Sequence, residues 1–153
     1  MSQQFPEKIK RVVVKVGSGV IANYRLKPRT AKLQSLVQQM ALARQQGVEV
    51  VFVSSGAIVL GMGEMGLKIR PTELSDLQAL AAIGQAVLMD TYSELFRKTK
   101  SKCAQVLLTW DDFADRPRYL NAKNTINTLL KLRSIPVINE NDIIGLNIAS
   151  NND

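Results

Sequence analysis

The stretch RVVVKVGSG, residues 11–19, decides the fold that this sequence predicts. Its valine-rich first part has little polar alternation, which is typical of a strand buried on both faces of a parallel sheet. Two glycines and a serine follow at once, so the backbone after the strand can approach a ligand closely. We therefore expect a buried parallel strand that leads directly into a ligand-binding turn.

Three further apolar runs share this character: residues 48–53, 103–108 and 135–138. Segments with apolar residues at helical spacing lie between the runs: 28–46, 75–88 and 119–133. Repeated alternation of strand and helix predicts an α/β fold with an open, mainly parallel sheet and helices on both faces. Gly47 is placed to cap the first helix, and Ser75 with Gln78 resembles a capping box that opens the second.

The composition bounds the class of protein. At 153 residues with 46% hydrophobic content, the chain fits a single domain with a real core. It contains no apolar run long enough to cross a membrane and no apolar secretory segment near its start. Its single cysteine, Cys103, cannot form an internal disulfide. We expect a cytoplasmic protein.

The absence of histidine restricts the chemistry further. Catalytic triads that use histidine, and most zinc sites, are excluded within this chain. Lysine, carboxylates, amides and backbone N–H groups remain. Phosphoryl transfer suits these groups, because it depends on positioning and charge stabilisation rather than on a base that titrates near pH 7.

The net charge of +7 raises the question of nucleic-acid binding. The one basic cluster, residues 97–102, falls where a helix should end, and the helix dipole favours cations there. Aromatic residues make up only 5% of the chain, and none interleaves with that cluster to stack on bases. No nucleic-acid partner is expected, whereas a polyphosphate ligand would benefit from the positive charge.

Ligands of open parallel sheets bind at the carboxyl ends of the strands. In this sequence those ends carry mostly small or hydrogen-bonding residues: 17–19 (GSG), 54–57 (SSGA), 109 (T) and 139–142 (NEND). Lys15 stands within the first strand and would supply a charge to a phosphoryl group, unless it only reaches solvent beside an ordinary turn. Residues 54–57 should open a helix, where a serine either caps the helix or contacts an anion.

Amides and carboxylates are densest at residues 139–142 and 151–153. Asn and Asp are common in turns, but these side chains would also bind the ammonium group of an amino acid. Metal ligation by Asp142 or Asp153 is open, although the spacing matches no EF-hand loop and we assign no metal site.

The segment GMGEMG, residues 61–66, matches the glycine fingerprint of dinucleotide-binding proteins. That fingerprint must lie at the turn between a strand and its helix. Here the preceding strand ends eight residues earlier, at Val53, and Pro71 follows soon after. We interpret the segment as a flexible loop that closes a helix.

Six stretches, in this order along the chain, resemble the amino acid kinase family: residues 13–18 (VVKVGS), 53–58 (VSSGAI), 81–85 (AAIGQ), 105–109 (QVLLT), 119–122 (YLNA) and 136–142 (PVINEND). The SGAI and VINEND elements together resemble the branch that phosphorylates the γ-carboxylate of glutamate. The resemblance implies the αβα sandwich of that family, glutamate and ATP as small-molecule partners, Mg²⁺ with the nucleotide, a homo-oligomer, and a place at the start of proline biosynthesis.

Roles in phosphoryl transfer carry over by position from this resemblance. Lys15 would contact the ATP phosphates and stabilise the transferring phosphoryl group, and Asp153 would orient the catalytic lysines. Backbone N–H groups would bind phosphate at Gly17, Ser18 and Gly56.

Roles in glutamate binding carry over to Ser55, Asp142 and Asn152. The family pattern usually reads Gly-Asp-Asn-Asp where this chain has SNND at residues 150–153, after a loop about two residues longer. The roles at the end of the chain therefore rest on a weaker match than the role of Ser55.

The resemblance also implies that residues 1–153 form the amino-terminal, substrate-binding part of an amino acid kinase domain. The nucleotide-base half, a second catalytic lysine and any PUA domain would be absent, so we expect the 153-residue chain alone to be inactive. Two alternatives stay open. The first is a relative that acts on acetylglutamate, aspartate, carbamate or UMP, and the second is an inactive fragment that binds an amino acid or a partner.

Overall fold

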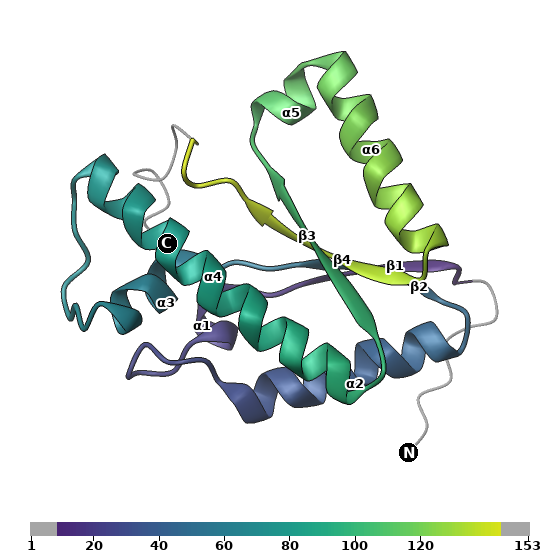
Figure 1. Cartoon of the computed structure of the whole chain (residues 1–153), viewed down its shortest axis with the longest axis horizontal. Helices are drawn as coiled ribbons and strands as arrows, with labels where there is room; N and C mark the ends of the chain where they lie inside the picture. The colour runs from purple at the N-terminus through teal and green to yellow at the C-terminus, as the bar shows by residue number, and fades with distance from the viewer. Residues whose placement is uncertain (1–8, 145–153) are drawn as a thin grey trace.

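A computed structural model describes residues 9–144 of the chain (Figure 1). Its four strands form one sheet: β1 (Arg11–Lys15), β2 (Glu49–Val53), β3 (Lys102–Leu108) and β4 (Ser134–Glu140). The strand order is β1-β2-β4-β3, and each neighbouring pair is parallel. The predicted open parallel sheet is confirmed, with β4 extending two residues beyond its predicted end at Ile138.

In the described part of the chain, six helices connect and cover the strands: α1 (Ser18–Ile21), α2 (Thr30–Gln45), α3 (Ala57–Glu64), α4 (Leu74–Lys98), α5 (Asp111–Ala114) and α6 (Arg116–Lys131). Figure 1 shows α2 and α4 on one side of the sheet and α6 on the other, as expected for helices on both faces. Across residues 9–144, no helix has the length and apolar character that a membrane span requires.

The main hydrophobic core lies between the sheet and the layer of α2 and α4. Tyr92 and Phe96 of α4 are fully buried, and so is Phe52 of β2. The rings of Phe52 and Tyr92 meet edge to face, with centroids 5.0 Å apart. Since β2 lies inside the sheet, this contact joins the long helix to the strand whose carboxyl end carries residues 54–57.

Gly47 caps α2 as predicted. It has a positive φ of 87°, and the N–H of the next residue, Val48, bonds to the carbonyl of Ala43. The basic residues also lie where expected, because Arg97 and Lys98 occupy the last turn of α4.

The capping box predicted at Ser75 is wrong. Helix α4 begins at Leu74 with Glu73 as its N-cap, and no side chain caps it, so Ser75 already lies inside the helix. Helix α6 begins before the predicted Tyr119, because the Asp115 carboxylate accepts a hydrogen bond of 2.9 Å from the backbone N–H of Arg118.

The interpretation of residues 61–66 as a flexible loop is also wrong, since Gly61 and Gly63 belong to α3. A Cβ atom on Gly61 would lie 2.0 Å from the carbonyl oxygen of Leu80, and one on Gly84 would lie 1.7 Å from that of Ala57. These glycines therefore let α3 and α4 cross with their backbones in contact. The segment lies inside a helix rather than at a strand-to-helix turn, so the dinucleotide fingerprint is rightly rejected.

Candidate active site

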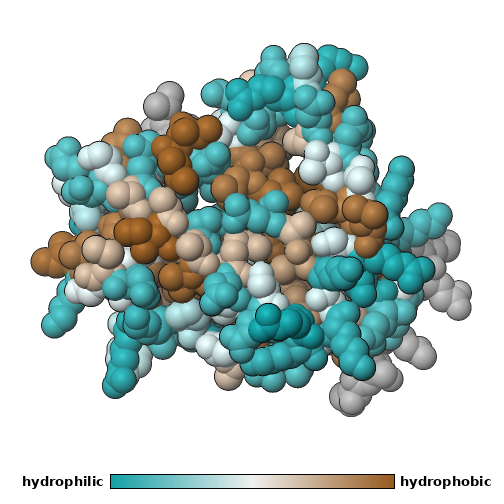
Figure 2. Space-filling model, in the orientation of Figure 1, coloured by the Kyte–Doolittle hydropathy of each residue, from teal (hydrophilic) through white to brown (hydrophobic). Residues whose placement is uncertain are grey.

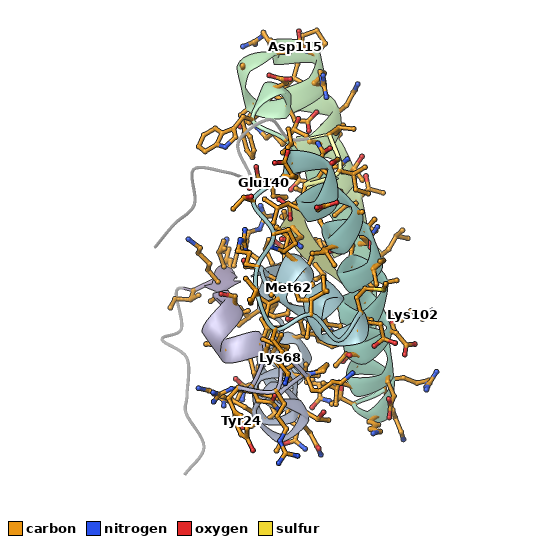
Figure 3. All side chains as sticks on the ribbon, turned by 90° about the vertical axis from the view of Figure 1, so that its left-hand side faces the viewer. Tyr24, Met62, Lys68, Lys102, Asp115 and Glu140 are labelled. Atoms are coloured by element: carbon orange, nitrogen blue, oxygen red, sulfur yellow. The ribbon has the colours of Figure 1, made fainter. Side chains whose placement is uncertain are left out.

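A cavity of about 570 Å³ lies at the carboxyl ends of β1, β2 and β4. Four segments line it: Lys15, Gly17 and Ser18 at the end of β1; residues 53–59 at the end of β2; Arg70 before α4; and Asn139, Glu140 and Asp142 at the end of β4. Figure 3 views the molecule from this side and shows Glu140 between the α5 end, marked by Asp115, and α3, marked by Met62. The predicted active edge of the sheet is thus a real cavity.

The β1 side of the cavity presents a lysine and a short turn. Lys15 is the last residue of β1 and is exposed, and the N–H of Val16 bonds to the carbonyl of Val53 at 2.9 Å. Gly17 then leads into α1, and a Cβ atom added to Gly17 would meet nothing within 4 Å. The first N–H groups of a helix have no intrahelical partner, so those beside Gly17 and Ser18 are available to a ligand.

The β2 side of the cavity is a tight turn into α3. Gly56 is the N-cap of α3 and has φ 90°, a conformation that L side chains rarely adopt. No side chain caps this helix, so of the two open alternatives for the serines of residues 54–57, the simple helix cap is excluded. Ser55 is exposed and lines the cavity together with the free N–H groups of the helix start.

Ser54, the neighbour of Ser55 in the chain, has a structural role. Ser54 is buried, and its Oγ lies 2.8 Å from the hydroxyl oxygen of Tyr92. Burial raises the pKa of Tyr92 well above its ordinary value. The backbone N–H of Ser54 also bonds to the carbonyl of Ile138 at 2.8 Å. Ser54 therefore fixes the start of the turn to both α4 and β4.

The β4 side of the cavity carries opposed charges. Asp142 is partly buried, and this burial together with the Glu140 carboxylate raises the pKa of Asp142 to about 6, while Arg70 acts in the opposite direction. At neutral pH Asp142 is still mostly ionised, so it can pair with a cation. Arg70 was not among the predicted site residues, because Arg-Pro in a sequence indicates only a helix boundary.

Asn139 belongs to a buried amide network rather than to the open cavity alone. Its Nδ2 donates to Gln85 Oε1 at 2.8 Å, and Gln85 Nε2 donates to Gln105 Oε1 at 3.0 Å. Its own Oδ1 accepts from the N–H of Glu140 at 2.9 Å. The network links α4 and β3 to the end of β4, a role that the sequence motifs containing these amides did not reveal.

The structure brings six predicted site residues around one cavity: Lys15, Gly17, Ser18, Ser55, Gly56 and Asp142. Asn152 and Asp153 lie outside the described residues.

Thr109 lines a separate cavity of about 210 Å³ beside Trp110 and Phe113, because its strand, β3, is the far edge of the sheet. Within residues 9–144, no group of three or more carboxylate, cysteine or histidine side chains is arranged to hold a metal.

Comparison with known families adds to this geometry. The model of the amino acid kinase family matches residues 10–153. The chain belongs to the amino acid kinase family. The lysine, glycine and serine residues that line the cavity thus lie within the matched part of an amino acid kinase.

Curated relatives within the family are named glutamate 5-kinase. The protein of Citrifermentans bemidjiense is 49% identical over 146 residues, which cover 94% of this chain and 39% of the relative. That of Methylococcus capsulatus is 47% identical over 135 residues, covering 88% and 36%. That of Hydrogenovibrio crunogenus is 46% identical over 138 residues, covering 90% and 37%. The chain thus spans well under half the length of these amino acid kinases.

Proposed function

We propose that this chain is the amino-terminal, glutamate- and phosphate-binding part of a glutamate 5-kinase. The reaction transfers the γ-phosphoryl group of ATP to the γ-carboxylate of glutamate and gives glutamyl 5-phosphate, the first step of proline biosynthesis. One observation supports the proposal: Lys15, the turns at Gly17 and Gly56, and the carboxylate of Asp142 line a single cavity, in a chain 47% identical to a glutamate 5-kinase.

The phosphate groups of ATP fit the β1 and β2 sides of the cavity. Lys15 would hold the transferring phosphoryl group, and the N–H groups at Gly17, Ser18 and Gly56 would hold phosphate oxygens. The open space beside Gly17 leaves room for this approach. ATP supplies the phosphoryl group when it is bound, and Mg²⁺ enters with its phosphates.

Glutamate fits the opposite side of the cavity. Asp142 would pair with the α-ammonium group, and Ser55 would contact the substrate from the start of α3. The γ-carboxylate is ionised at neutral pH, so it attacks without a general base. What the reaction needs is alignment of the two substrates and cations that offset the repulsion between carboxylate and phosphate. The cavity offers both without histidine.

The complete activity is proposed for the longer enzyme. Asn152 would also bind glutamate and Asp153 would orient the catalytic lysines, while the nucleotide base and a second lysine belong to the part of the relatives that this chain does not match. The isolated chain would then bind ligands without catalysing the phosphorylation of glutamate. A cytoplasmic location and association of several copies stay predictions.

A chimaera tests the proposal. The matched residues of the Citrifermentans bemidjiense relative are replaced by this chain, and ADP formation is measured with glutamate, acetylglutamate and aspartate in turn. We expect activity with glutamate, and none from the 153-residue chain alone. A preference for acetylglutamate or aspartate would contradict glutamate as the substrate. Glutamate-dependent ADP formation by the chain alone would contradict the proposal that catalysis needs the longer enzyme.

Two variants of the chimaera separate the proposed roles. Lys15→Met should lower kcat by orders of magnitude with little change in glutamate binding, because its charge acts mainly in the transition state. Asp142→Ala should raise KM for glutamate roughly 10- to 150-fold, since it loses a charge-assisted hydrogen bond of about 1.5–3 kcal/mol. An unchanged kcat for the first, or a raised KM for ATP alone in the second, would show that the assignments are wrong.

A further inference from the structure

Among the described residues, four charged side chains line the cavity: Lys15, Arg70, Glu140 and Asp142. The proposed function uses Lys15 for phosphate and Asp142 for the α-ammonium group of glutamate. The α-carboxylate of glutamate then has no charged partner in that assignment, although burying a carboxylate without a cation is costly. Arg70 is the second cation of the cavity and has no role in that assignment.

Arg70 reaches the cavity from the segment between α3 and α4, whereas Asp142 follows β4. The two side chains are electrostatic neighbours, because the charge of Arg70 lowers the pKa of Asp142 against the effect of burial. None of the ion pairs found within residues 9–144 includes Arg70. A guanidinium group has five N–H donors in a planar fork that fits a carboxylate with two parallel hydrogen bonds.

We propose that Arg70 binds the α-carboxylate of the amino-acid substrate and, with Asp142, selects for an α-amino acid. The inference rests on the proposed function. The ammonium and carboxylate groups of an amino acid are attached to the same carbon atom, so their partners must be a neighbouring anion and cation. Arg70 and Asp142 form such a pair in the lining of the cavity, and Lys15 is the remaining cation of the same lining, available to the side-chain carboxylate.

A role for Arg70 in holding ATP phosphates is less consistent with the charges around it. A polyphosphate in contact with Arg70 would also lie against the carboxylates of Asp142 and Glu140, which repel it. A substrate that carries its own ammonium group beside its carboxylate meets no such repulsion. The lining therefore favours the zwitterionic end of an amino acid at Arg70.

Ligands that lack one group at a time test the inference on the 153-residue chain itself. L-Glutamate, 4-aminobutyrate (no α-carboxylate) and glutarate (no ammonium group) are titrated at pH 8, where Asp142 is ionised, and binding is followed by NMR chemical shifts. Arg70→Met should weaken L-glutamate binding roughly 10- to 100-fold and leave 4-aminobutyrate within about twofold. Asp142→Asn should weaken L-glutamate in the same range and spare glutarate.

Lys68→Met is the matched control, because Lys68 is an exposed cation of the same segment and does not line the cavity (Figure 3). It should change none of the three affinities. Arg70→Lys keeps the charge but loses the planar fork, so it should fall between wild type and Arg70→Met. Arg70 is exposed, and a circular dichroism spectrum of each variant checks that the fold is kept.

The outcomes separate the inference from the proposed function. If the wild-type chain binds L-glutamate but Arg70→Met weakens L-glutamate and 4-aminobutyrate equally, the inference is overturned and the proposed function stands. Loss of affinity for a non-hydrolysable ATP analogue in Arg70→Met, with L-glutamate unchanged, also overturns the inference. A wild-type chain that binds no L-glutamate overturns both.

Discussion

Helices α4 and α6 cover opposite faces of one sheet, but they contribute to the core very unequally. Nine residues of α4 are buried, whereas α6 buries only Leu130. On the α6 side, Val13 of β1 is 65% exposed and Trp110 is 70% exposed. Figure 2 shows hydrophobic residues gathered between α6 and the strands beneath it. The stability of the described part should therefore come mainly from the α4 layer.

The same inequality holds for the site. Tyr92 of α4 hydrogen-bonds to Ser54, and Gln85 of α4 hydrogen-bonds to Asn139. Gly84 of α4 has no Cβ atom, so the backbone of α3 packs directly against it. Each of these contacts fixes a turn that lines the cavity, while α6 contributes no residue to its lining. Helix α4 therefore serves both as core and as support for the turns that line the cavity.

The largest expected effect is at the crossing of α3 and α4. Gly84→Ala places a Cβ atom 1.7 Å from the carbonyl oxygen of Ala57, so the two backbones must separate. We expect a loss of about 4 kcal/mol or more in the free energy of unfolding, measured in urea. Gly19→Ala is the control, since a Cβ atom there meets nothing within 4 Å. Similar stability of the two variants would contradict the close crossing.

Truncation of a core leucine should show the inequality of the two layers directly. Leu88 of α4 is fully buried, so Leu88→Ala should cost about 3 kcal/mol through lost burial and the cavity left behind. Leu120 of α6 is 39% exposed, and Leu120→Ala should cost less than about 1 kcal/mol. Equal losses in urea unfolding would show that α6 stabilises the sheet as much as α4 does.

A single hydroxyl group makes a finer comparison. Tyr92→Phe keeps the ring in the core but removes the 2.8 Å hydrogen bond with Ser54 Oγ, which keeps only a longer bond to the carbonyl of Ser55, so it should cost about 1–2 kcal/mol in thermal or urea unfolding. Tyr119→Phe on α6 removes a hydroxyl group from an exposed side chain and should change stability by less than about 0.5 kcal/mol. If Ser54→Ala and the double variant lose as much as Tyr92→Phe alone, the two groups act as one unit.

The smallest effect is on the dependence of stability on pH. The pKa of Asp142 is raised to about 6 in the folded chain, so between its ordinary value of 3.8 and 6 the unfolded state binds fewer protons than the folded state. Stability from this group therefore falls as pH rises through that window. Relative to wild type, Asp142→Asn should become more stable from pH 4 to pH 7, as followed by urea unfolding at each pH.

Asp112 of α5 is a control of opposite sign. Hydrogen bonds from the N–H and hydroxyl of Thr109, and the charge of Arg118, lower its pKa. Its stabilising contribution is present above its ordinary pKa value and is lost as pH falls through the lower folded value. Asp112→Asn should therefore be the less stable chain at pH 7 and approach wild type in acid. The same pH trend for both variants would contradict one of the two pKa directions.

Much of the fold followed from local patterns. Each strand was predicted within about two residues, because short apolar runs between helical segments are typical of buried parallel strands. The start of α6 was missed because the helix, capped by Asp115, begins at Arg116, three residues before the predicted start at Tyr119. Ser75 was misassigned because its spacing to Gln78 matches a capping box, whereas the helix already begins at Leu74. Local signals identify elements well and their ends less well.

Local patterns likewise predicted some residues of the candidate site and missed others. Lys15, Gly17 and Ser55 could be predicted to lie at the cavity because each is within two residues of the end of a strand, and parallel strands bring their carboxyl ends to one edge. Arg70 was missed because it is far along the chain from every strand end and reaches the cavity only through the path between α3 and α4.

The sequence by itself determined the class of fold, the family and the edge of the sheet where the candidate cavity lies, since these depend on short-range patterns and on motifs in a fixed order. Tertiary structure alone decided the order of the strands, the packing of Gly61 and Gly84, and the charge state of Asp142. These features arise from contacts between segments far apart in the chain. Burial and neighbouring charge exist only once those segments have met, and no local pattern encodes them.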